Sequence, residues 1–120
     1  MIDSRKMAEW VAVAADDKKA RDITLIEVEK VSTVADYFVV CTGTSTTQVK
    51  AIADSIEHAL EAHGVAQPRV EGGREGRWIL QDYGPVVVHV MLDEEREFYG
   101  LERLWKTGRV EPWQAPPAVV

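Results

Sequence analysis

Few residues in this 120-residue chain could do chemistry, and their spacing argues against catalysis. Three histidines, His58, His63 and His89, accompany one cysteine, Cys41, and this set does not match a zinc-binding pattern. His58 and His63 are five residues apart on an expected helix, so their side chains diverge. Cys41 lies inside an apolar run, where a buried and inert thiol is expected in place of an activated nucleophile. We therefore expect no metal site and no nucleophilic catalysis.

The segment Gly43-Thr44-Ser45 stands where a strand-like run gives way to a helix-like one. Backbone amides at such a turn could bind a phosphate, but no lysine follows at the Walker spacing. Ser45 or Thr46 can instead cap the first turn of the following helix. We expect this capping role and no cofactor.

A predicted β-hairpin carries the strongest functional signal. Its strand-like runs, residues 77–82 and 86–92, flank a Tyr-Gly-Pro turn at residues 83–85. Glycine permits the turn, and proline cannot donate a ladder hydrogen bond. The register that we expect from this turn places Trp78 opposite His89.

The two faces of this hairpin differ, because successive side chains of a strand point to opposite sides. The almost wholly apolar face suits packing beneath helices, which leaves the mixed face outward. A tryptophan and a methionine beside an acid and an imidazole are typical of a docking surface around an aromatic anchor. The alternative is that Trp78 and Met91 fill a second small core beneath a loop. The mixed face contains Trp78, Leu80, Asp82, Val87, His89 and Met91, and the apolar face contains Ile79, Gln81, Val86, Val88, Val90 and Leu92.

Acidic residues follow the hairpin at the start of the last expected helix: Asp93, Glu94, Glu95 and Glu97. Negative charge there interacts favourably with the helix dipole, which explains the acids without any function. They could also form an acidic rim beside the mixed face, where charge would affect the rate and specificity of association with a basic partner.

Apolar spacing predicts the elements that position these residues. Helices are expected over residues 7–15, from Ser45 or Thr46 to a stop at Gly64, and from about residue 94 to residue 105. The middle helix should bury Val49, Ile52, Ala53, Ile56 and Leu60, and the last should bury Phe98, Leu101 and Leu104 or Trp105.

Strands are expected at residues 23–28, 37–42 and 69–71, in addition to the hairpin. The run 37–42 has no polar alternation, so it should be buried on both faces and central in the sheet. This order predicts an α/β fold, or α+β under stricter labels, with a mixed sheet of about five strands covered by helices. Pro112, Pro116 and Pro117 predict a tail without regular structure.

Length and composition favour one folded domain in a reducing compartment. The chain is long enough for one core, has no apolar run of membrane-spanning length, and carries acids near its start that signal peptides avoid. A lone cysteine fits the cytoplasm. The net charge of −6 opposes nonspecific binding to nucleic acid and favours a basic protein partner, unless it only keeps the chain soluble.

Several segments together resemble the ribosomal silencing factor family, also called the RsfS or Iojap family. They are residues 36–45 (DYFVVCTGTS), Trp78–Asp82 (WILQD), residues 88–91 (VHVM) and residues 99–105 (YGLERLW), in the family's order and spacing. The likeness covers residues 7–105. We therefore expect a ribosomal silencing factor domain over residues 1–105 and a proline-containing tail over residues 106–120.

The resemblance implies a protein that binds the large ribosomal subunit through its ribosomal protein fourteen. It would sterically block the small subunit and lower translation when nutrients are scarce, without enzymatic activity and with a tendency to form homodimers. The family's fold is similar to that of nucleotidyltransferases, so an enzyme is a rival interpretation. Glu27 and Glu29 have the spacing of a metal-binding pair, but they precede Gly43-Thr44-Ser45, so two-metal chemistry lacks its ligands. A generic dimeric adaptor is the third interpretation.

For the ribosome contact we expect Trp78 to insert into an apolar depression of the partner, flanked by Leu80 and Met91. Some contact residues carry over from the family motifs by position, and the others come from the face argument. The first group is Trp78, Asp82, His89, Met91 and Tyr99, and the second is Leu80, Tyr83, Asp93 and Glu94. Arg96 is expected to extend the contact. Membrane binding and sequence-specific nucleic-acid binding are not expected.

Overall fold

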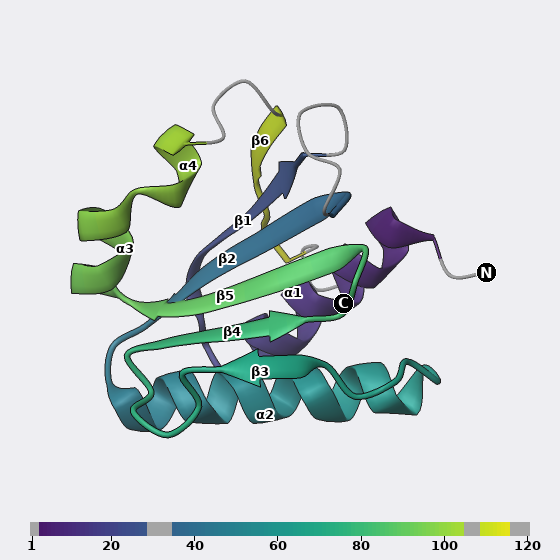
Figure 1. Ribbon diagram of the computed structural model, residues 1–120, viewed down its shortest axis with the longest axis horizontal. Coiled ribbons are helices and arrows are strands. Elements are labelled where there is room, and N and C mark those ends of the chain that lie inside the picture. Colours follow the sequence, from purple (N-terminus) through teal and green to yellow (C-terminus); the bar gives the residue numbers. More distant parts are fainter. Residues whose placement is uncertain (1–2, 29–34, 105–108, 116–120) are drawn as a thin grey trace, which may run out of the picture.

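A computed structural model describes residues 3–28, 35–104 and 109–115 of the chain. It is a mixed α+β fold in which helices pack on one sheet (Figure 1), as predicted. The elements in chain order are α1 (Ser4–Asp17), β1 (Arg21–Glu27), β2 (Tyr37–Gly43), α2 (Thr46–Ala62), β3 (Arg69–Glu71), β4 (Trp78–Asp82), β5 (Val86–Leu92), α3 (Asp93–Tyr99), α4 (Leu101–Leu104) and β6 (Arg109–Pro112).

The sheet has six strands in the order β3-β4-β5-β2-β1-β6. Its centre is the parallel pair β2 and β5, and the neighbours on both sides are antiparallel. Strand β2 is buried along nearly its whole length, and only its residue Phe38 is partly exposed. The predicted central position of this apolar run is therefore confirmed.

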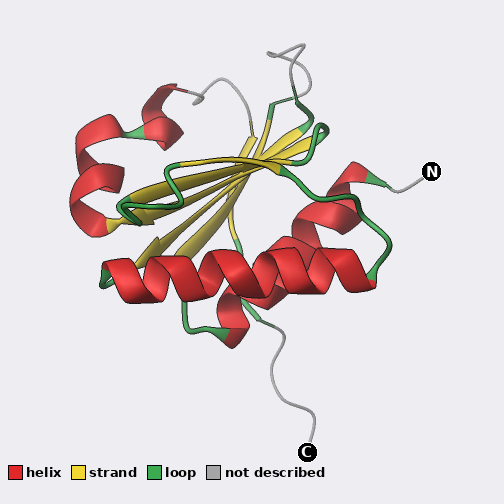
Figure 2. Ribbon diagram, turned by 60° about the horizontal axis from the view of Figure 1, so that its bottom comes forward, coloured by secondary structure: helices red, strands yellow, loops and turns green. Residues whose placement is uncertain are grey.

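Helices α1 and α2 cover one face of the sheet, whereas α3 and α4 lie near one end of the strands (Figure 2). The buried side of α2 is the predicted one, with Val49, Ile52, Ala53, Ile56 and Leu60 all in the main core. This core also takes inward side chains from the central strands, such as Val39 and Val88. Burial of apolar area here supplies most of the driving force for folding.

Local sequence determines where α2 begins and ends. The Ser45 side chain accepts a hydrogen bond from the Gln48 backbone amide at 3.1 Å, which confirms the capping role. The Gln48 side-chain oxygen in turn accepts from the Thr44 amide, at 2.6 Å. Gly43 is packed closely, since a Cβ there would lie 2.9 Å from a Val49 methyl. At the other end Gly64 takes a left-handed φ of 82°, which stops the helix as expected.

The last helix is shorter than the sequence predicts, because Gly100 breaks it with a left-handed φ of 54°. Leu101 is buried as expected, but Phe98 is 79% exposed, so its predicted burial is wrong. Phe98 lies on α3, which has no buried residue. The predicted burial of Leu104 or Trp105 lies outside the described side chains.

Part of the proline-containing tail forms a strand, which corrects the expectation of no regular structure. Strand β6 pairs antiparallel with β1, and the Trp113 amide continues the ladder by donating to the Ile23 carbonyl at 2.8 Å. Arg5 on α1 forms an ion pair with Glu111 at 2.8 Å, and this partner lowers the pKa of the Glu111 carboxyl. The prolines did not prevent the strand, because an edge strand can place a proline where no ladder donor is needed.

No helix in the described ranges is long and apolar enough to cross a membrane.

Removal of β6 should destabilise the domain. We expect a chain ending at residue 108 to lose about 2 kcal/mol or more of unfolding free energy, since it forfeits several backbone hydrogen bonds and the packing of Trp113. Urea unfolding followed by circular dichroism measures the change. The matched reference is a chain ending at Ala115, which keeps β6. Equal unfolding midpoints for the two chains would show that β6 contributes nothing.

Candidate protein-docking face

The β4–β5 hairpin has the predicted faces but a different register. Trp78 pairs with Met91 and Leu80 pairs with His89, two residues away from the expected alignment. The reason is the turn, in which the Tyr83 amide donates to the Val86 carbonyl at 3.0 Å and Gly84 takes a φ of 93°. Because the offset is an even number of residues, every side chain stays on its predicted side.

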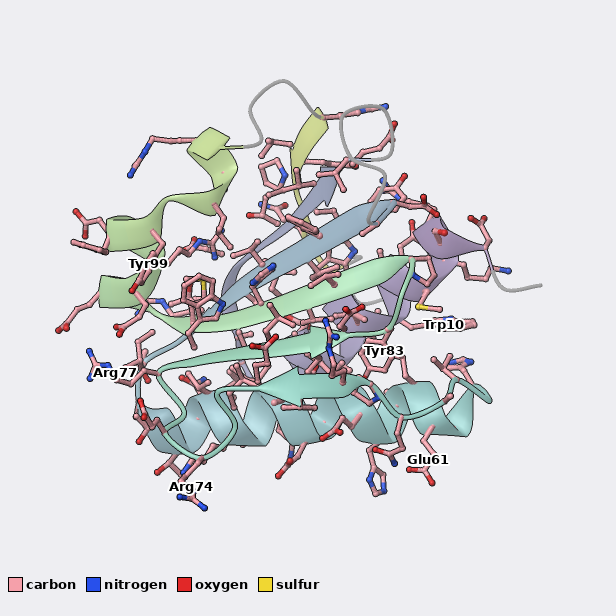
Figure 3. The ribbon with its side chains drawn as sticks, viewed as in Figure 1. Trp10, Glu61, Arg74, Arg77, Tyr83 and Tyr99 are labelled. Carbon is pink, nitrogen blue, oxygen red and sulfur yellow. The ribbon has the colours of Figure 1, made fainter. Side chains whose placement is uncertain are left out.

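Aromatic rings from three strands and one helix form a continuous row on the mixed side of the sheet. The Trp78 indole donates from Nε1 to Nδ1 of His89 at 3.0 Å, and the His89 ring meets Phe38 edge to face at 5.2 Å. On its other side the Trp78 ring lies 4.6 Å from Tyr99, which in turn contacts Phe98 at 5.0 Å. Figure 3 shows Tyr99 reaching from α3 toward the sheet. With Leu80, these five rings make up what we call the aromatic face.

The aromatic face is exposed at one end and buried at the other. Phe98 is 79% exposed and Tyr99 is 48% exposed, and Trp78 and Leu80 are half-buried. His89 and Met91 are 5% and 0% exposed, so the expectation that both point to solvent is wrong. Met91 instead joins a second small core with Val40 and Leu101, which the sequence had suggested as the alternative. Only part of the predicted face is therefore available to a partner.

Arg96 is held by the chain itself. Its guanidinium donates to the Glu102 carboxylate at 2.7 Å, to the Asp22 carbonyl at 2.6 Å, and to the hydroxyls of Thr42 and Thr24 at 3.0 and 2.9 Å. The side chain is 13% exposed. These bonds tie α3 and α4 to strands β1 and β2, so the geometry supports a structural role.

The acidic start of α3 lies beside the exposed end of the aromatic face. Glu95 pairs with Arg77 through two hydrogen bonds of 2.7 and 3.0 Å, and Glu94 approaches the same guanidinium at 3.5 Å. Asp93 and Glu94 are exposed. The predicted rim is therefore a mixed one, with Arg77 partly neutralising its acids.

Two other predicted contact residues do not belong to the row of rings. Tyr83 packs against the core under α1 and α2, and burial raises the pKa of its phenol, with the nearby Glu57 adding to the shift. Asp82 stabilises the hairpin turn by accepting from the Gly84 amide at 2.8 Å and pairs with Arg69 at 3.2 Å. Figure 3 shows Tyr83 far from Tyr99.

The other side chains that could react have surroundings that fit a structural role. Burial raises the pKa of the Cys41 thiol to about 12, so it stays protonated and unreactive near neutral pH. Glu27 accepts a hydrogen bond from the Tyr37 hydroxyl at 3.2 Å. Among the residues that the structure describes, no three His, Cys, Asp or Glu side chains are grouped as metal ligands.

His89 makes stability depend on pH. Burial lowers its pKa from 6.5 to about 4, so between these values the unfolded chain binds more protons than the folded one. The unfolding free energy that depends on a neutral His89 is fully present above about pH 6.5 and is lost as the pH falls toward about 4. We expect wild type to lose roughly 2 kcal/mol more than His89→Phe between about pH 7.5 and about pH 5, measured by urea unfolding. Equal losses would show that His89 does not stay neutral in the fold.

Arg96→Lys should destabilise the fold by about 2–3 kcal/mol, because a lysine cannot reproduce the several directed hydrogen bonds of the guanidinium. Thermal unfolding monitored by circular dichroism tests this. Arg103→Lys is the matched control, since Arg103 is exposed and makes one 3.3 Å bond to the Glu97 carbonyl. If both variants unfold at the same temperature, the Arg96 hydrogen bonds contribute little to stability.

Comparison with known proteins identifies the family. The family model described as "Ribosomal silencing factor during starvation" matches residues 1–118. A ribosomal silencing factor from Bacillus subtilis is 43% identical over 104 residues, which are 87% of this chain and 88% of that protein. The mouse protein named mitochondrial assembly of ribosomal large subunit protein 1 is 37% identical over 73% of this chain and 40% of its own length.

Two solved structures share the fold of this chain. The crystal structure of a Chromobacterium violaceum protein superposes with a TM-score of 0.85 at 34% identity, covering 99% of this chain and 94% of that one. A Bacillus halodurans crystal structure gives a TM-score of 0.76 at 38% identity, over 84% and 94% of the two chains. The match of the family model to almost the whole chain, together with these relatives, shows that the chain belongs to the ribosomal silencing factor family.

Proposed function

We propose that this protein binds the large ribosomal subunit through ribosomal protein fourteen and blocks the small subunit by occupying its place. In this proposal it acts in the cytoplasm as a translational repressor under nutrient limitation, forms a homodimer, and catalyses no reaction. Family membership supports the ribosome as its target.

The observation that carries this proposal is the exposed end of the aromatic face. Phe98 and Tyr99 stand out from α3, beside the half-buried Trp78 and Leu80. Large exposed aromatic side chains cost solubility, and they are typical of the centre of a protein interface. Trp78 is held by His89 and Tyr99, so we assign it the floor of the contact and assign Phe98 and Tyr99 the insertion into the partner.

Charge around the aromatic face supports a basic protein as the partner. Asp93 and Glu94 are exposed at its edge, and the chain carries a net charge of −6. Such charges speed encounter with a positively charged surface and oppose binding to bare RNA. We leave Arg96 and Tyr83 out of the proposed contact, because one is bound internally and the other lies toward the main core.

Co-sedimentation with purified large ribosomal subunits tests the function. We expect the protein to pellet with large subunits and to prevent their joining when small subunits are added. Joining that proceeds normally with the protein bound would contradict the steric block. Absence of co-sedimentation would favour a generic adaptor, and turnover of nucleotide with magnesium would favour the enzyme.

Removing the aromatic anchors should weaken binding without unfolding the chain. Phe98→Ala and Tyr99→Ala should each lower the affinity for large subunits by about 1–3 kcal/mol, and Trp78→Ala by about 2–4 kcal/mol, as for interface hot spots. Sedimentation at graded subunit concentrations measures the dissociation constant. Val13→Ala is the matched control, because Val13 is 49% exposed on α1, away from the aromatic face. Equal binding by all four variants would place the interface elsewhere.

A further inference from the structure

Helix α3 carries the two exposed rings of the aromatic face, Phe98 and Tyr99, yet it has no buried residue. A surface helix is ordinarily held by an apolar stripe that faces the core. Arg96 of α3 instead reaches the sheet with its guanidinium, which donates to the hydroxyls of Thr42 on β2 and Thr24 on β1. The position of the two rings therefore depends strongly on polar groups of the sheet.

Part of the acceptor set for Arg96 comes from an irregular segment of β1. The register with β2 shifts between Arg21 and Thr24, which marks a β-bulge. Asp22 in this bulge has a left-handed φ of 48°, a conformation that side chains other than glycine rarely adopt. Its carbonyl oxygen accepts from Nη1 of Arg96 at 2.6 Å and from the Thr24 hydroxyl at 3.1 Å. A backbone acceptor of the bulge thus serves α3.

These bonds use all the donors of Arg96. A guanidinium has five N–H groups in a rigid planar arrangement. Nε and Nη2 face the Glu102 carboxylate, Nη1 faces the Asp22 carbonyl and the Thr42 hydroxyl, and Nη2 also faces the Thr24 hydroxyl. Because each bond has a fixed direction, the three acceptors on the sheet define one position for α3. We call Asp22, Thr24 and Thr42 the Arg96 seat.

The C-terminal strand is bonded to the same bulge. The Trp113 amide donates to the Ile23 carbonyl at 2.8 Å, and β6 pairs with β1 as far as Thr24. Arg96 and Trp113 both line a hollow of about 560 Å³, whose lining also includes Asp22 and Thr24. The segment 22–24 is therefore bonded both to α3 and to β6.

We propose that Asp22, Thr24 and Thr42 are positioning residues for the partner contact, and that β6 keeps this seat in shape. The inference rests on the proposed docking through the aromatic face. Thr24 and Thr42 are 7% and 0% exposed, so they act through Arg96 and do not touch a partner themselves. With α3 fixed in this way Tyr99 lies against Trp78, and a partner meets rings that are already arranged.

Paired substitutions test the seat by sedimentation with large subunits at graded concentrations. Valine has nearly the shape of threonine but no acceptor, whereas serine keeps the hydroxyl. The double variant Thr24→Val with Thr42→Val should weaken binding at least about tenfold, because charge-assisted hydrogen bonds to Arg96 are lost. The double variant Thr24→Ser with Thr42→Ser should bind within about threefold of wild type, since these bonds remain.

The position of α3 is measured in the free protein by NMR. The ring centroids of Trp78 and Tyr99 are 4.6 Å apart, so their protons should show a nuclear Overhauser effect. We expect this ring signal in wild type and in the serine double variant, and its loss in the valine double variant. Ile52→Val trims the main core and is the control for lowered stability, so it should keep both the ring signal and the affinity.

The role of β6 is tested with the same ring signal. The chain ending at residue 108 should lose the signal, and the chain ending at Ala115 should keep it. If the shorter chain does not fold, Trp113→Pro removes the amide that bonds to Ile23, and Trp113→Ala is its matched control because it keeps that amide. An unchanged ring signal in the shorter chain, or in Trp113→Pro where that variant decides, would overturn the role of β6.

The outcomes separate the seat from the proposed function. An unchanged ring signal in the valine double variant, or its loss with unchanged affinity, would overturn the positioning role and leave docking on the ribosome intact. Equal losses in Ile52→Val would reduce the effect to stability and overturn it as well. If the valine double variant does not fold, Thr24→Val alone decides by the same two readouts. Absence of binding by wild type would refute the proposed function, and with it the docking role of the seat.

Discussion

The parallel pairing of β2 with β5 at the centre of the sheet is the constraint on which the rest of the structure depends. Both strands are buried on both sides, so their backbone groups can pair only with each other and with β1 and β4, away from water. Each side therefore needs a cover. Helices α1 and α2 cover the side of Val39 and Val88 with a large core. The side of Val40 and Met91 receives a smaller core with Leu101 from α4.

The smaller core on the Val40 and Met91 side of the sheet explains where a docking surface can arise. On that side, strand β4 and helix α3 contribute rings that are only partly buried or exposed, from Trp78 through Tyr99 to Phe98. Arg96 holds α3 in place by bonding to Thr24 and Thr42 of the sheet. The rings are thus pre-positioned, so a partner would meet them with little loss of side-chain entropy. This connects the packing of the sheet with the proposed binding of the ribosome.

Short-range sequence patterns predicted the features that depend on neighbouring residues. The stripe of α2, the Ser45 cap and the alternation of the hairpin depend on neighbours a few residues away, and all are confirmed. The errors arose where distant residues decide the outcome. The sequence shows a glycine at position 100, where a helix can end. It does not show that Phe98 is exposed, because burial depends on tertiary packing. The pairing of β6 with β1 and the bonds of Arg96 join residues far apart in sequence, so no short-range pattern could reveal them.

Site-specific photo-cross-linking tests the central claim most directly. A benzoyl-phenylalanine in place of Phe98 should attach this protein to ribosomal protein fourteen when large subunits are illuminated, because Phe98 stands at the exposed end of the aromatic face. The same group in place of Val13 should give no such adduct. An adduct with ribosomal protein fourteen from position 13 and none from position 98 would contradict docking through the aromatic face.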